Sequence, residues 1–359
     1  MNAVNLLYSD VENELRASVR ALLDERSPAS TVLAHVEDAD NTDLKVWRTL
    51  ATELGCAGLP VPEEHGGAGA TWRETAVVAE ELGRAVTPAP FLGSAVLGTA
   101  ALLATGDRDT LASVASGERI VTLAVPLAAM PGAYQPSVKA RGDRLTGTIT
   151  SVADAGHADA LLVPADDGLY LVQASEATRT PVVSLDMTRR LTDVTLDDAS
   201  ARKIADGTAA LDRALTVGAA MLAAEQLGLA DHCLATTLAY VKERKQFART
   251  IGSYQAIKHR LADLYATVSQ ARAVTRYAVS CVADDDPDAA VAVALAQAYT
   301  SEAVVTAAEE CVQMHGGIGF TWEHPAHLYL KRAKADSIAF GTAAHHRAAL
   351  AALVDLPPA

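Results

Sequence analysis

The stretch TAALDRALTVGAAMLAAEQLGLADHCLATTLAYVKER, residues 208–244, decides how the C-terminal part of the chain folds. Alanine and leucine have high helix propensity, so the stretch predicts one long helix with small residues along one side. Alanine-rich stretches at 254–283 and 287–316 predict two more helices, and a fourth is expected from about residue 325. Long helices joined by short loops predict a four-helix bundle over 205–359.

A change in amino-acid composition divides the part of the chain before this bundle into two regions. Segments such as ERIVTLAV, SVKARGDRLTGTIT and ADALLVPADDGLYLVQA are short, rich in Val, Leu and Thr, and separated by Gly, Asp and Pro. They predict a middle β-domain, a barrel or sandwich, over 117–204, with hairpin turns at Gly142-Asp143 and Asp167-Gly168. Residues 1–116 predict a helical N-terminal domain. The expected fold class is therefore mainly α with a central β-domain. The N-terminal helices are expected at 8–26, 42–55, 73–86 and 93–105.

Composition and charge exclude several classes of protein. The formal net charge of −14 argues against a nucleic-acid-binding protein, which would normally carry a basic face. The N-terminus lacks the basic start and apolar region of a signal peptide, and no uncharged apolar run is long enough to span a bilayer. The four cysteines form no CxxC pair, which favours buried thiols in a reducing cytosol. We therefore expect a cytoplasmic protein.

Two stretches carry residues suited to binding an anion. In YVKERKQFARTIGSYQAIKHRLADL, residues 240–264, Arg244 and other basic side chains precede a break at Gly252 and then Gln255. A guanidinium can bind phosphate through two hydrogen bonds. A basic helix end is equally expected to be solvated and to complement the helix dipole, so this pattern alone leaves both interpretations open.

The second stretch is CVQMHGGIGFTWEHPAHLYLKRA, residues 311–333. Gln313 lies just before Gly316 and Gly317, and glycines let backbone N–H groups approach a phosphate closely. The spacing is not that of the dinucleotide fingerprint GxGxxG, so the alternatives are a phosphate cradle and a plain helix–helix turn. His315, His324 and His327 surround this turn, but no HExxH-type spacing accompanies them, and we expect no metal site.

Together, the order of the segments and their motifs resemble the acyl-CoA dehydrogenase family over nearly the whole chain. LPVPEEHGGAG, residues 59–69, resembles the family's P-EE-GG-G loop. ERKQFARTIGSYQAIKHRLADL, residues 243–264, is similar to its R-QFG-PIG-FQ---H-LAD signature, and VQMHGGIGFTWEHPAHLYLKRA to its Q--GG-G element. These last residues have the form found among steroid side-chain dehydrogenases of actinobacteria.

The resemblance implies an N-terminal helical domain, a middle β-domain and a C-terminal helical bundle, with flavin adenine dinucleotide (FAD) bound between subunits. It implies an acyl-CoA thioester as substrate and an electron-transfer flavoprotein as electron acceptor. In the family a carboxylate removes an α-proton while the flavin accepts a β-hydride. The positions that it matches to contacts with a neighbouring subunit's flavin are Arg244, Phe247, Gln255, Gln313, Gly316 and Gly317. Thr342 matches the threonine of the EGT element, which touches the phosphates.

The sequence departs from the family where the flavin ring and the base are expected. The base position is occupied by Phe340, which cannot accept a proton. In a subset of the family the catalytic Glu lies instead in an ERL-like element early in the first bundle helix. The matching stretch here, LDRAL, has Asp212 at that position. Arg213, which follows it, is a candidate substrate contact. Asp212 is a candidate base, or simply an acid favoured by the helix N-terminus.

The β-domain departs further from the family. The flavin-binding TEPGAGSD loop is matched by PLAAMPGAY, residues 126–134. Ser151 replaces the flavin-stacking Trp, Ala153 replaces the Thr that faces N5, and Ala344 replaces the Gln after EGT. Contacts to the chain's own flavin ring are thus lost, whereas contacts to a neighbour's flavin are kept.

Four hypotheses follow from this pattern. The first is a half-site subunit of a heteromeric (α2β2) dehydrogenase, in which a paralogous subunit holds the flavin ring and the substrate is a bulky, possibly steroid-derived, acyl-CoA. The second is a self-sufficient homo-oligomeric enzyme that uses Asp212. The third is a non-catalytic scaffold subunit, and the fourth is a flavin monooxygenase on the same fold.

Overall fold

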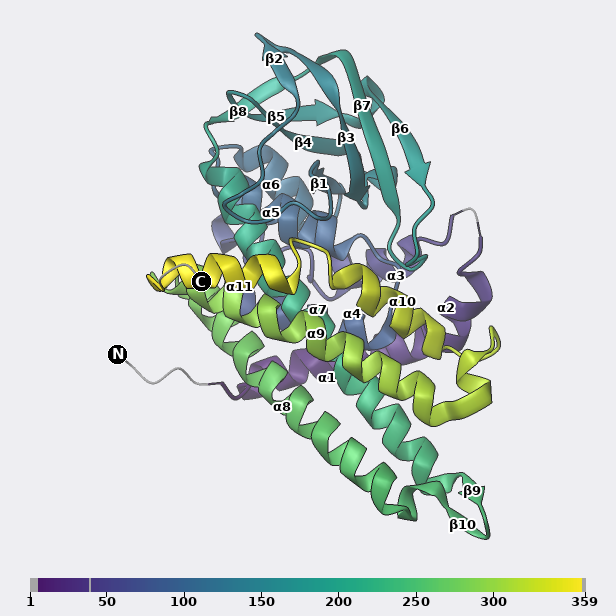
Figure 1. Cartoon of the computed structure of the whole chain (residues 1–359). Coiled ribbons are helices and arrows are strands. Elements are labelled where there is room, and N and C mark those ends of the chain that lie inside the picture. The colour runs from purple at the N-terminus through teal and green to yellow at the C-terminus, as the bar shows by residue number, and fades with distance from the viewer. Residues whose placement is uncertain (1–5, 39, 357–359) are drawn as a thin grey trace.

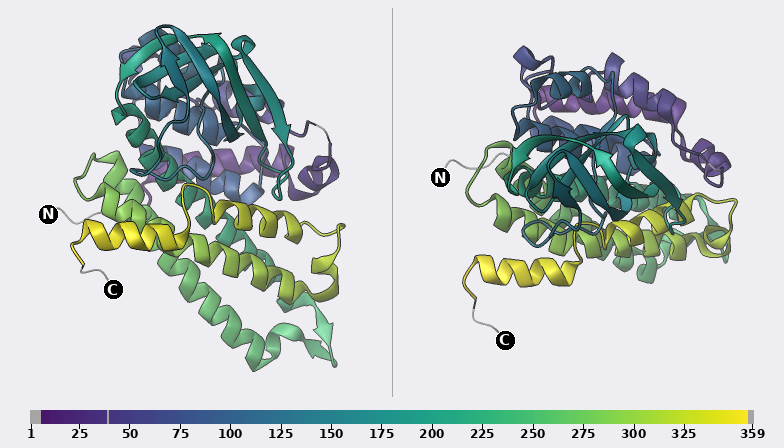
Figure 2. Two further views of the ribbon diagram at one scale, coloured as in Figure 1. Left: turned by 45° about the horizontal axis from the view of Figure 1, so that its top comes forward. Right: turned by 90° about the horizontal axis from the view of Figure 1, so that it is seen from above.

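The computed structural model describes residues 6–38 and 40–356 of the chain. Helices come first in the sequence, strands follow, and long helices end the chain (Figure 1). Figures 1 and 2 show the β-sheets on one side of the molecule and the long helices α7, α8 and α9 extending away from them. This arrangement is the mainly α fold with a central β-domain that the sequence predicts.

The N-terminal part consists of short helices, several of them with side-chain caps. Ser9 and Thr71 each form a capping box, with Glu12 and Glu74, which satisfies free N–H groups at the starts of α1 and α4. The helices of this part are α1 (Asp10–Arg26), α2 (Ala29–His35), α3 (Leu44–Arg48), α4 (Trp72–Ala85), α5 (Thr99–Leu103) and α6 (Arg108–Ala115). Two π-helical segments, Thr49–Glu53 and Phe91–Gly98, extend α3 and precede α5.

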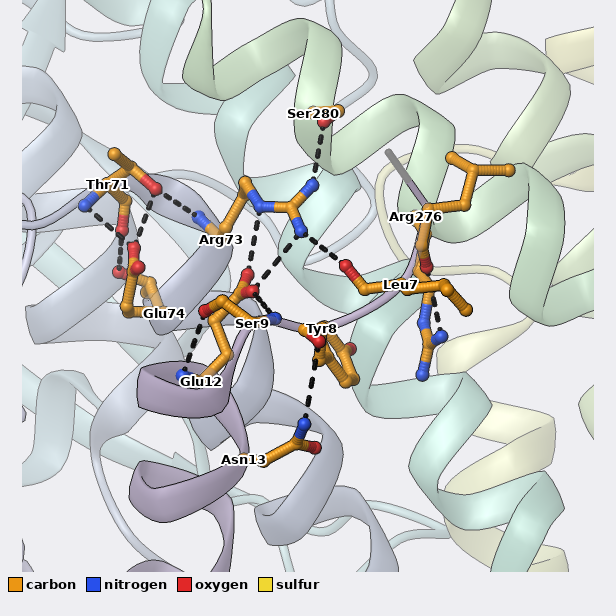
Figure 3. A network of polar contacts seen from close by, with 12 residues as sticks. Leu7, Tyr8, Ser9, Glu12, Asn13, Thr71, Arg73, Glu74, Arg276 and Ser280 are labelled. Carbon is orange, nitrogen blue, oxygen red and sulfur yellow. Dashed lines mark hydrogen bonds and ion pairs between the residues drawn. The ribbon is translucent and has the colours of Figure 1, made fainter. Parts of the chain in front are cut away.

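A polar network fastens the start of the chain to α4 and α8 (Figure 3). The guanidinium of Arg73 donates hydrogen bonds to Glu12 at 2.9 Å, to the hydroxyl of Ser280 at 2.9 Å and to the carbonyl of Leu7 at 3.1 Å. The guanidinium of Arg276 lies 3.9 Å from the centre of the Tyr8 ring. Charge-assisted contacts of this kind hold α1 against the bundle.

Two four-stranded sheets form the middle of the chain and enclose a shared apolar core. One sheet has the order β1-β4-β5-β8 and the other β2-β3-β7-β6. The strands are β1 (Val121–Leu123), β2 (Lys139–Arg141), β3 (Arg144–Ala153), β4 (Ala160–Ala165), β5 (Gly168–Gln173), β6 (Ala177–Val182), β7 (Leu191–Ser200) and β8 (Arg202–Asp206). Strand β8 therefore ends two residues beyond the predicted range 117–204.

One of the two predicted hairpin turns is correct and the other is displaced. Arg141 pairs with Arg144, so Gly142 and Asp143 form the two-residue turn between β2 and β3, as expected. Ala165 pairs with Gly168, so the turn between β4 and β5 is Asp166-Asp167 and not Asp167-Gly168. Gly168 instead belongs to β5, where a side chain would collide with the backbone of β8 at Ala205.

The C-terminal part is built on three long helices, α7 (Ala209–Glu243), α8 (Gln255–Ala283) and α9 (Ala289–His315). Two shorter helices complete it, α10 (Ala326–Asp336) and α11 (Ala343–Leu353). Within the described part of the chain, α9 with the turn after it is the one stretch long and apolar enough to cross a membrane. It packs against α7, α8, α10 and α11, and 56% of its apolar window is buried, so it is a core helix.

A cluster of buried charges joins α7 and α10 to the loop before β7. Arg332 on α10 lies 2.6 Å from Asp186 and 2.5 Å from Glu225 of α7, and Arg189 also pairs with Glu225. Asp336 is fully buried, and the guanidinium of Arg189 lies 3.8 Å from its carboxylate. Within the described residues neither oxygen of Asp336 has a hydrogen-bond partner. Burial raises the pKa of Asp336 to about 8, and the nearby Glu225 carboxylate adds to this.

Candidate functional site

A small hairpin projects from the far end of α7 and α8 and carries part of the predicted site. Its strands are β9 (Lys245–Gln246) and β10 (Arg249–Thr250), and Phe247 and Ala248 form the turn. Both turn residues have positive φ, 50° and 62°, and the side chain of Phe247 is 90% exposed. Phe247 thus presents its ring to solvent from a turn whose backbone conformation is strained for a residue other than glycine.

The basic side chains of this hairpin lie at the surface. Arg244, at the C-terminus of α7, is exposed, and its amide caps the helix by donating to the carbonyl of Tyr240. The guanidinium of Arg249 stacks 3.7 Å above the centre of the Tyr254 ring, which stiffens the base of the hairpin. Gln255 is the first residue of α8 and is also exposed. Free N–H groups at the start of a helix suit an anion.

The glycine-rich turn that follows α9 has the geometry of a cradle. Gly316 ends α9 with φ 62° and ψ −139°, a conformation open essentially to glycine alone. Gly317 has an ordinary negative φ, and a Cβ placed on it would meet no atom of the chain within 4 Å. Among the described residues, therefore, no contact requires glycine at 317. Gln313, one turn earlier, is exposed on the same end of α9.

The structure brings the hairpin and the glycine turn to the same end of the bundle (Figure 1). The hydroxyl of Tyr240 on α7 donates a hydrogen bond to the carbonyl of His315 at 3.4 Å, and the two rings stack with centres 4.4 Å apart. Val241, Leu261 and Met314 form a small apolar cluster beneath them. The predicted contacts of the 240–264 and 311–333 stretches thus form one surface.

Thr342 lies apart from that surface. Its hydroxyl caps the N-terminus of α11 by accepting a hydrogen bond from the amide of His345 at 3.3 Å. Helix α10, eleven residues or about 16 Å long, separates it from the glycine turn.

Residue 340, which the motif resemblance matches to the family's base, is a buried aromatic ring. Phe340 is fully buried, and its ring lies against Gly218 of α7. Its backbone amide donates a hydrogen bond to the carbonyl of Leu127 at 2.8 Å, and the amide of Leu127 donates to the carbonyl of Ser151 at 3.0 Å. Leu127 thus ties together the three places where the sequence departs from the family. Leu97, Leu127, Ala129, Ala153 and Phe340 belong to one hydrophobic core.

Asp212 and Arg213 are engaged at the start of α7. The carboxylate of Asp212 accepts a hydrogen bond from the hydroxyl of Thr208 at 2.9 Å, which is a local helix-start contact. Arg213 forms an ion pair with Asp285 at 2.6 Å and donates to the carbonyl of Val282 at 3.1 Å, so it holds α7 to the turn after α8. The roles predicted for them as base and substrate contact stay predictions.

The three histidines of the glycine turn pack rather than converge. The rings of His315 and His324 lie 4.6 Å apart, and His327 contacts Trp322 edge-on at 4.6 Å. Over residues 6–38 and 40–356, no group of three or more His, Cys, Asp and Glu side chains is arranged to hold a metal ion.

The structural role of Leu127 was not predicted from the sequence. Nothing in its local sequence shows that its carbonyl accepts a hydrogen bond from Phe340, more than 200 positions away.

Comparison with known proteins agrees with this geometry. Residues 9–118 match the model of the acyl-CoA dehydrogenase N-terminal domain, and residues 205–354 match that of the C-terminal domain. The chain is 39% identical over 328 residues to acyl-CoA dehydrogenase IpdE2 of Mycolicibacterium smegmatis, covering 90% of this chain and 93% of that protein. It is 32% identical over 338 residues to acyl-CoA dehydrogenase FadE34 of Mycobacterium tuberculosis, covering 90% of this chain and 45% of that protein.

Two solved assemblies are similar in structure. A chain of the ChsE4-ChsE5 complex from Mycobacterium tuberculosis superposes with a TM-score of 0.89 at 29% identity, covering 99% of this chain and 100% of that one. A chain of a variant of the Tcur3481-Tcur3483 steroid ACAD superposes with a TM-score of 0.86 at 31% identity, covering 96% and 98%. The chain therefore belongs to the acyl-CoA dehydrogenase family of FAD-dependent CH–CH oxidoreductases, and it is related to heteromeric members of that family.

Proposed function

We propose that this chain is a subunit of a heteromeric FAD-dependent acyl-CoA dehydrogenase and contributes a half-site to the flavin of a partner subunit. The observation that carries the proposal is an asymmetry within one chain. The surface that the resemblance matches to a neighbour's flavin is exposed at Phe247 and open around Gly317. The position matched to the chain's own flavin ring and base is filled by Phe340 and Leu127.

In this proposal each exposed residue has a defined part. Arg244 would pair with the negative charge of the partner's cofactor, and Phe247 would cover its adenosine part. Gln313 would hydrogen-bond to it, while Gly316 and Gly317 would let it approach the end of α9 closely. The flavin, when bound, supplies the redox chemistry, and the paralogous subunit supplies the base.

The similar proteins support an inference about the substrate and the subunit assembly. The Tcur3481-Tcur3483 protein is described as a steroid ACAD, and the ChsE4-ChsE5 structure is a complex of two different chains. We infer that the assembled enzyme is an α2β2 tetramer and that its substrate is a bulky, steroid-derived acyl-CoA thioester. We further infer that an electron-transfer flavoprotein is its electron acceptor and that it is located in the cytoplasm. We likewise propose domain limits at 1–116, 117–204 and 205–359.

Flavin content and activity test the proposal. The chain is purified alone and after coexpression with a paralogous acyl-CoA dehydrogenase subunit, and bound FAD is measured against the number of subunits. We expect no flavin-dependent turnover from the chain alone and two flavins per α2β2 tetramer. Four flavins per tetramer, or full activity from this chain alone, would contradict the proposal.

A matched pair of variants locates the flavin contact. Arg244→Ala removes the guanidinium, whereas Lys242→Ala removes an exposed positive charge two residues earlier on the same helix end. We expect Arg244→Ala in the complex to weaken flavin binding by about tenfold or more, because a charge-assisted contact is lost. Lys242→Ala should leave flavin binding nearly unchanged. Equal effects of the two variants would favour general electrostatic attraction, and no effect of either would favour a scaffold subunit.

A further inference from the structure

A groove between α7 and α8 lies beside the hairpin but outside the surface matched to the flavin. The two helices run together toward that hairpin (Figure 1), and the groove between them has a volume of about 510 Å³. This volume lies within the range of about 300–1,000 Å³ that is usual for small-molecule sites. None of the residues matched to a flavin contact lines it. Its apolar lining comes from Leu234, Leu238 and Val241 of α7 and from Leu261, Ala262 and Tyr265 of α8.

The packing of the two helices and of the connector between them shapes this groove. Val241 and Leu261 are buried and form its floor, whereas Leu238 and Tyr265 are 39% and 64% exposed and border its opening. The connector from the hairpin to α8 lies directly against α7, because Gly252 has no side chain there. A Cβ at residue 252 would come within 2.8 Å of the carbonyl oxygen of Val241. The groove is therefore a feature of the packed bundle.

The connector offers a ligand little hydrogen bonding, because its polar groups bond to one another. The hydroxyl of Ser253 donates to the carbonyl of Thr250 at 2.6 Å, and the amide of Tyr254 donates to the carbonyl of Ile251 at 3.2 Å. A peptide brings an N–H and a C=O group with each residue, and these need partners when they are buried. The lining of the groove therefore favours a ligand with an apolar body over a peptide segment.

Two lysines give the groove a local positive charge. Lys242 of α7 and Lys258 of α8 both line it, and both side chains are exposed. No ion pair among residues 6–38 and 40–356 includes either of them, whereas Lys334, for comparison, pairs with Glu309 at 2.7 Å. No acidic side chain of the described residues lines the groove. An apolar groove with two lysines, one on each helix, is complementary to an apolar molecule with an acidic head.

We propose that this groove binds a free monocarboxylate with a long apolar body, such as a fatty acid. The apolar body lies along Leu238, Val241 and Leu261, and the carboxylate accepts hydrogen bonds from the ammonium groups of Lys242 and Lys258. Within the described chain no arginine lines the groove, so it lacks the planar fork that suits phosphate. The proposal does not rest on the half-site function, because it uses neither Arg244 nor the glycine turn.

Calorimetric titration of the purified full-length chain with dodecanoate, below its micelle-forming concentration, tests the proposal. We expect saturable binding of one molecule per chain. Dodecanol keeps the apolar body without the charge and should bind about tenfold more weakly or worse. Acetate keeps the charge without the apolar body and should show no saturable binding. Equal binding of dodecanoate and dodecanol would overturn the role of the lysines, and an absence of saturable dodecanoate binding would overturn the site.

A matched pair of tryptophan variants locates the ligand. Ala262 and Ala266 are both exposed on α8, but only Ala262 lines the groove. Ala262→Trp fills the groove and should weaken dodecanoate binding by about tenfold or more, whereas Ala266→Trp should leave it within about twofold. Thermal unfolding of both variants checks that each remains folded. Equal effects of the two substitutions would place the ligand elsewhere.

A second pair of variants tests the charge and separates the two proposals. Lys258→Ala should weaken dodecanoate binding by about two- to fivefold, as expected for an exposed ionic contact. Lys245→Ala removes an exposed charge that does not line the groove and should have little effect. Lys242→Ala should weaken dodecanoate binding while flavin binding by the complex stays nearly unchanged, and Arg244→Ala should do the reverse. Loss of only one of these two responses identifies which proposal is wrong.

Photochemical labelling extends the test to the assembled enzyme. A dodecanoate analogue with a diazirine at the end of its chain is irradiated with the chain alone and with the coexpressed complex, and labelled peptides are mapped. We expect labels within residues 234–265 of this chain in both samples, and competition by unlabelled dodecanoate. Labels confined to other segments would overturn the site. A groove that is labelled in the chain alone but not in the complex would be a subunit contact, and the proposal would then be wrong for the assembled enzyme.

Discussion

The backbone amide of Phe340 donates a hydrogen bond to the carbonyl of Leu127 over 2.8 Å. This contact joins the position that the motif resemblance matches to the family's base with the loop that it matches to the family's flavin-binding loop. Residue 340 has φ 52°, and His346 fixes its carbonyl by donating a hydrogen bond from Nε2 at 2.9 Å. The two departures from the family are therefore parts of one packed structure, and changing one alone does not restore the other.

Restoring a carboxylate at 340 should not restore catalysis. In Phe340→Glu the new side chain replaces a fully buried ring in the main hydrophobic core, so we expect a destabilisation of several kcal/mol and no turnover of acyl-CoA. Phe340→Leu, which keeps the site apolar, should cost about 1–2 kcal/mol. Thermal unfolding and a flavin-reduction assay with the chain alone provide the measurements. A stable Phe340→Glu protein that reduces flavin by itself would show that the site is open after all.

Gly316 and Gly317 should respond in opposite ways to alanine. Gly316→Ala forces a side chain into a backbone conformation that only glycine adopts easily, so the chain should lose about 1–3 kcal/mol of stability. Gly317→Ala meets no atom of the chain, so its unfolding free energy should change by less than about 0.5 kcal/mol. The same Gly317→Ala change should lower flavin binding by the assembled complex, because the added methyl group occupies the approach to the turn. Denaturant unfolding and flavin titration distinguish the two effects, and unchanged flavin affinity in Gly317→Ala would exclude a close contact there.

The sequence predicted the long elements well because their signals extend over many residues. Alanine and leucine propensity summed over 208–244 indicates one helix, and the structure has α7 at Ala209–Glu243. Short elements gave no such signal, so α2 and α6 were not predicted. The turn between β4 and β5 was displaced by one residue, because Asp166, Asp167 and Gly168 are all typical of turns and only the strand register decides among them.

The candidate site was predictable only in part, for a related reason. Motifs such as R-QF and Q--GG lie within short stretches, so Arg244 and Gly317 can be identified from their neighbours in sequence. The packing at Phe340 depends on contacts among segments far apart in the chain, namely the loop at Leu127, the strand at Ser151 and the turn at Phe340. No local pattern encodes such contacts. The sequence therefore indicates where this chain departs from the family's motifs, and the structure shows how the residues at those positions pack.

Asp212→Asn distinguishes a half-site subunit from a self-sufficient enzyme. Asp212 bonds to Thr208 at the start of α7, so its neutral variant should lose about 0.3–1 kcal/mol of stability through the helix dipole. In the complex with a paralogous subunit we expect turnover within about twofold of the unmodified enzyme. Steady-state kinetics and thermal unfolding of the same preparations check both statements. Abolished turnover with flavin still bound would instead identify Asp212 as the base.

The buried carboxyl of Asp336 should make the stability of the chain depend on pH. Its pKa is raised from the ordinary value of 3.8 to about 8 by burial and then by Glu225, so the folded chain holds a proton that the unfolded chain releases. The stabilisation is complete below pH 4 and is lost as the pH rises toward 8. The pKa of Glu225 is lowered instead, because its two arginine partners, Arg189 and Arg332, outweigh burial. Its effect on stability is therefore confined to pH values below about 4.5, outside the window in which Asp336 titrates.

Asp336→Asn keeps the shape of the side chain and removes its titration. Between pH 5 and 8 we expect the unfolding free energy of the unmodified chain to fall by about 1–4 kcal/mol relative to that of Asp336→Asn. The variant should therefore gain in relative stability toward pH 8. Urea unfolding of both proteins at several pH values tests this, since the histidines titrate in both and cancel in the difference. Asp166→Asn, at an exposed turn, serves as the control and should run parallel to the unmodified chain above pH 5. Parallel curves for Asp336→Asn as well would mean that Asp336 is already ionised in the folded chain.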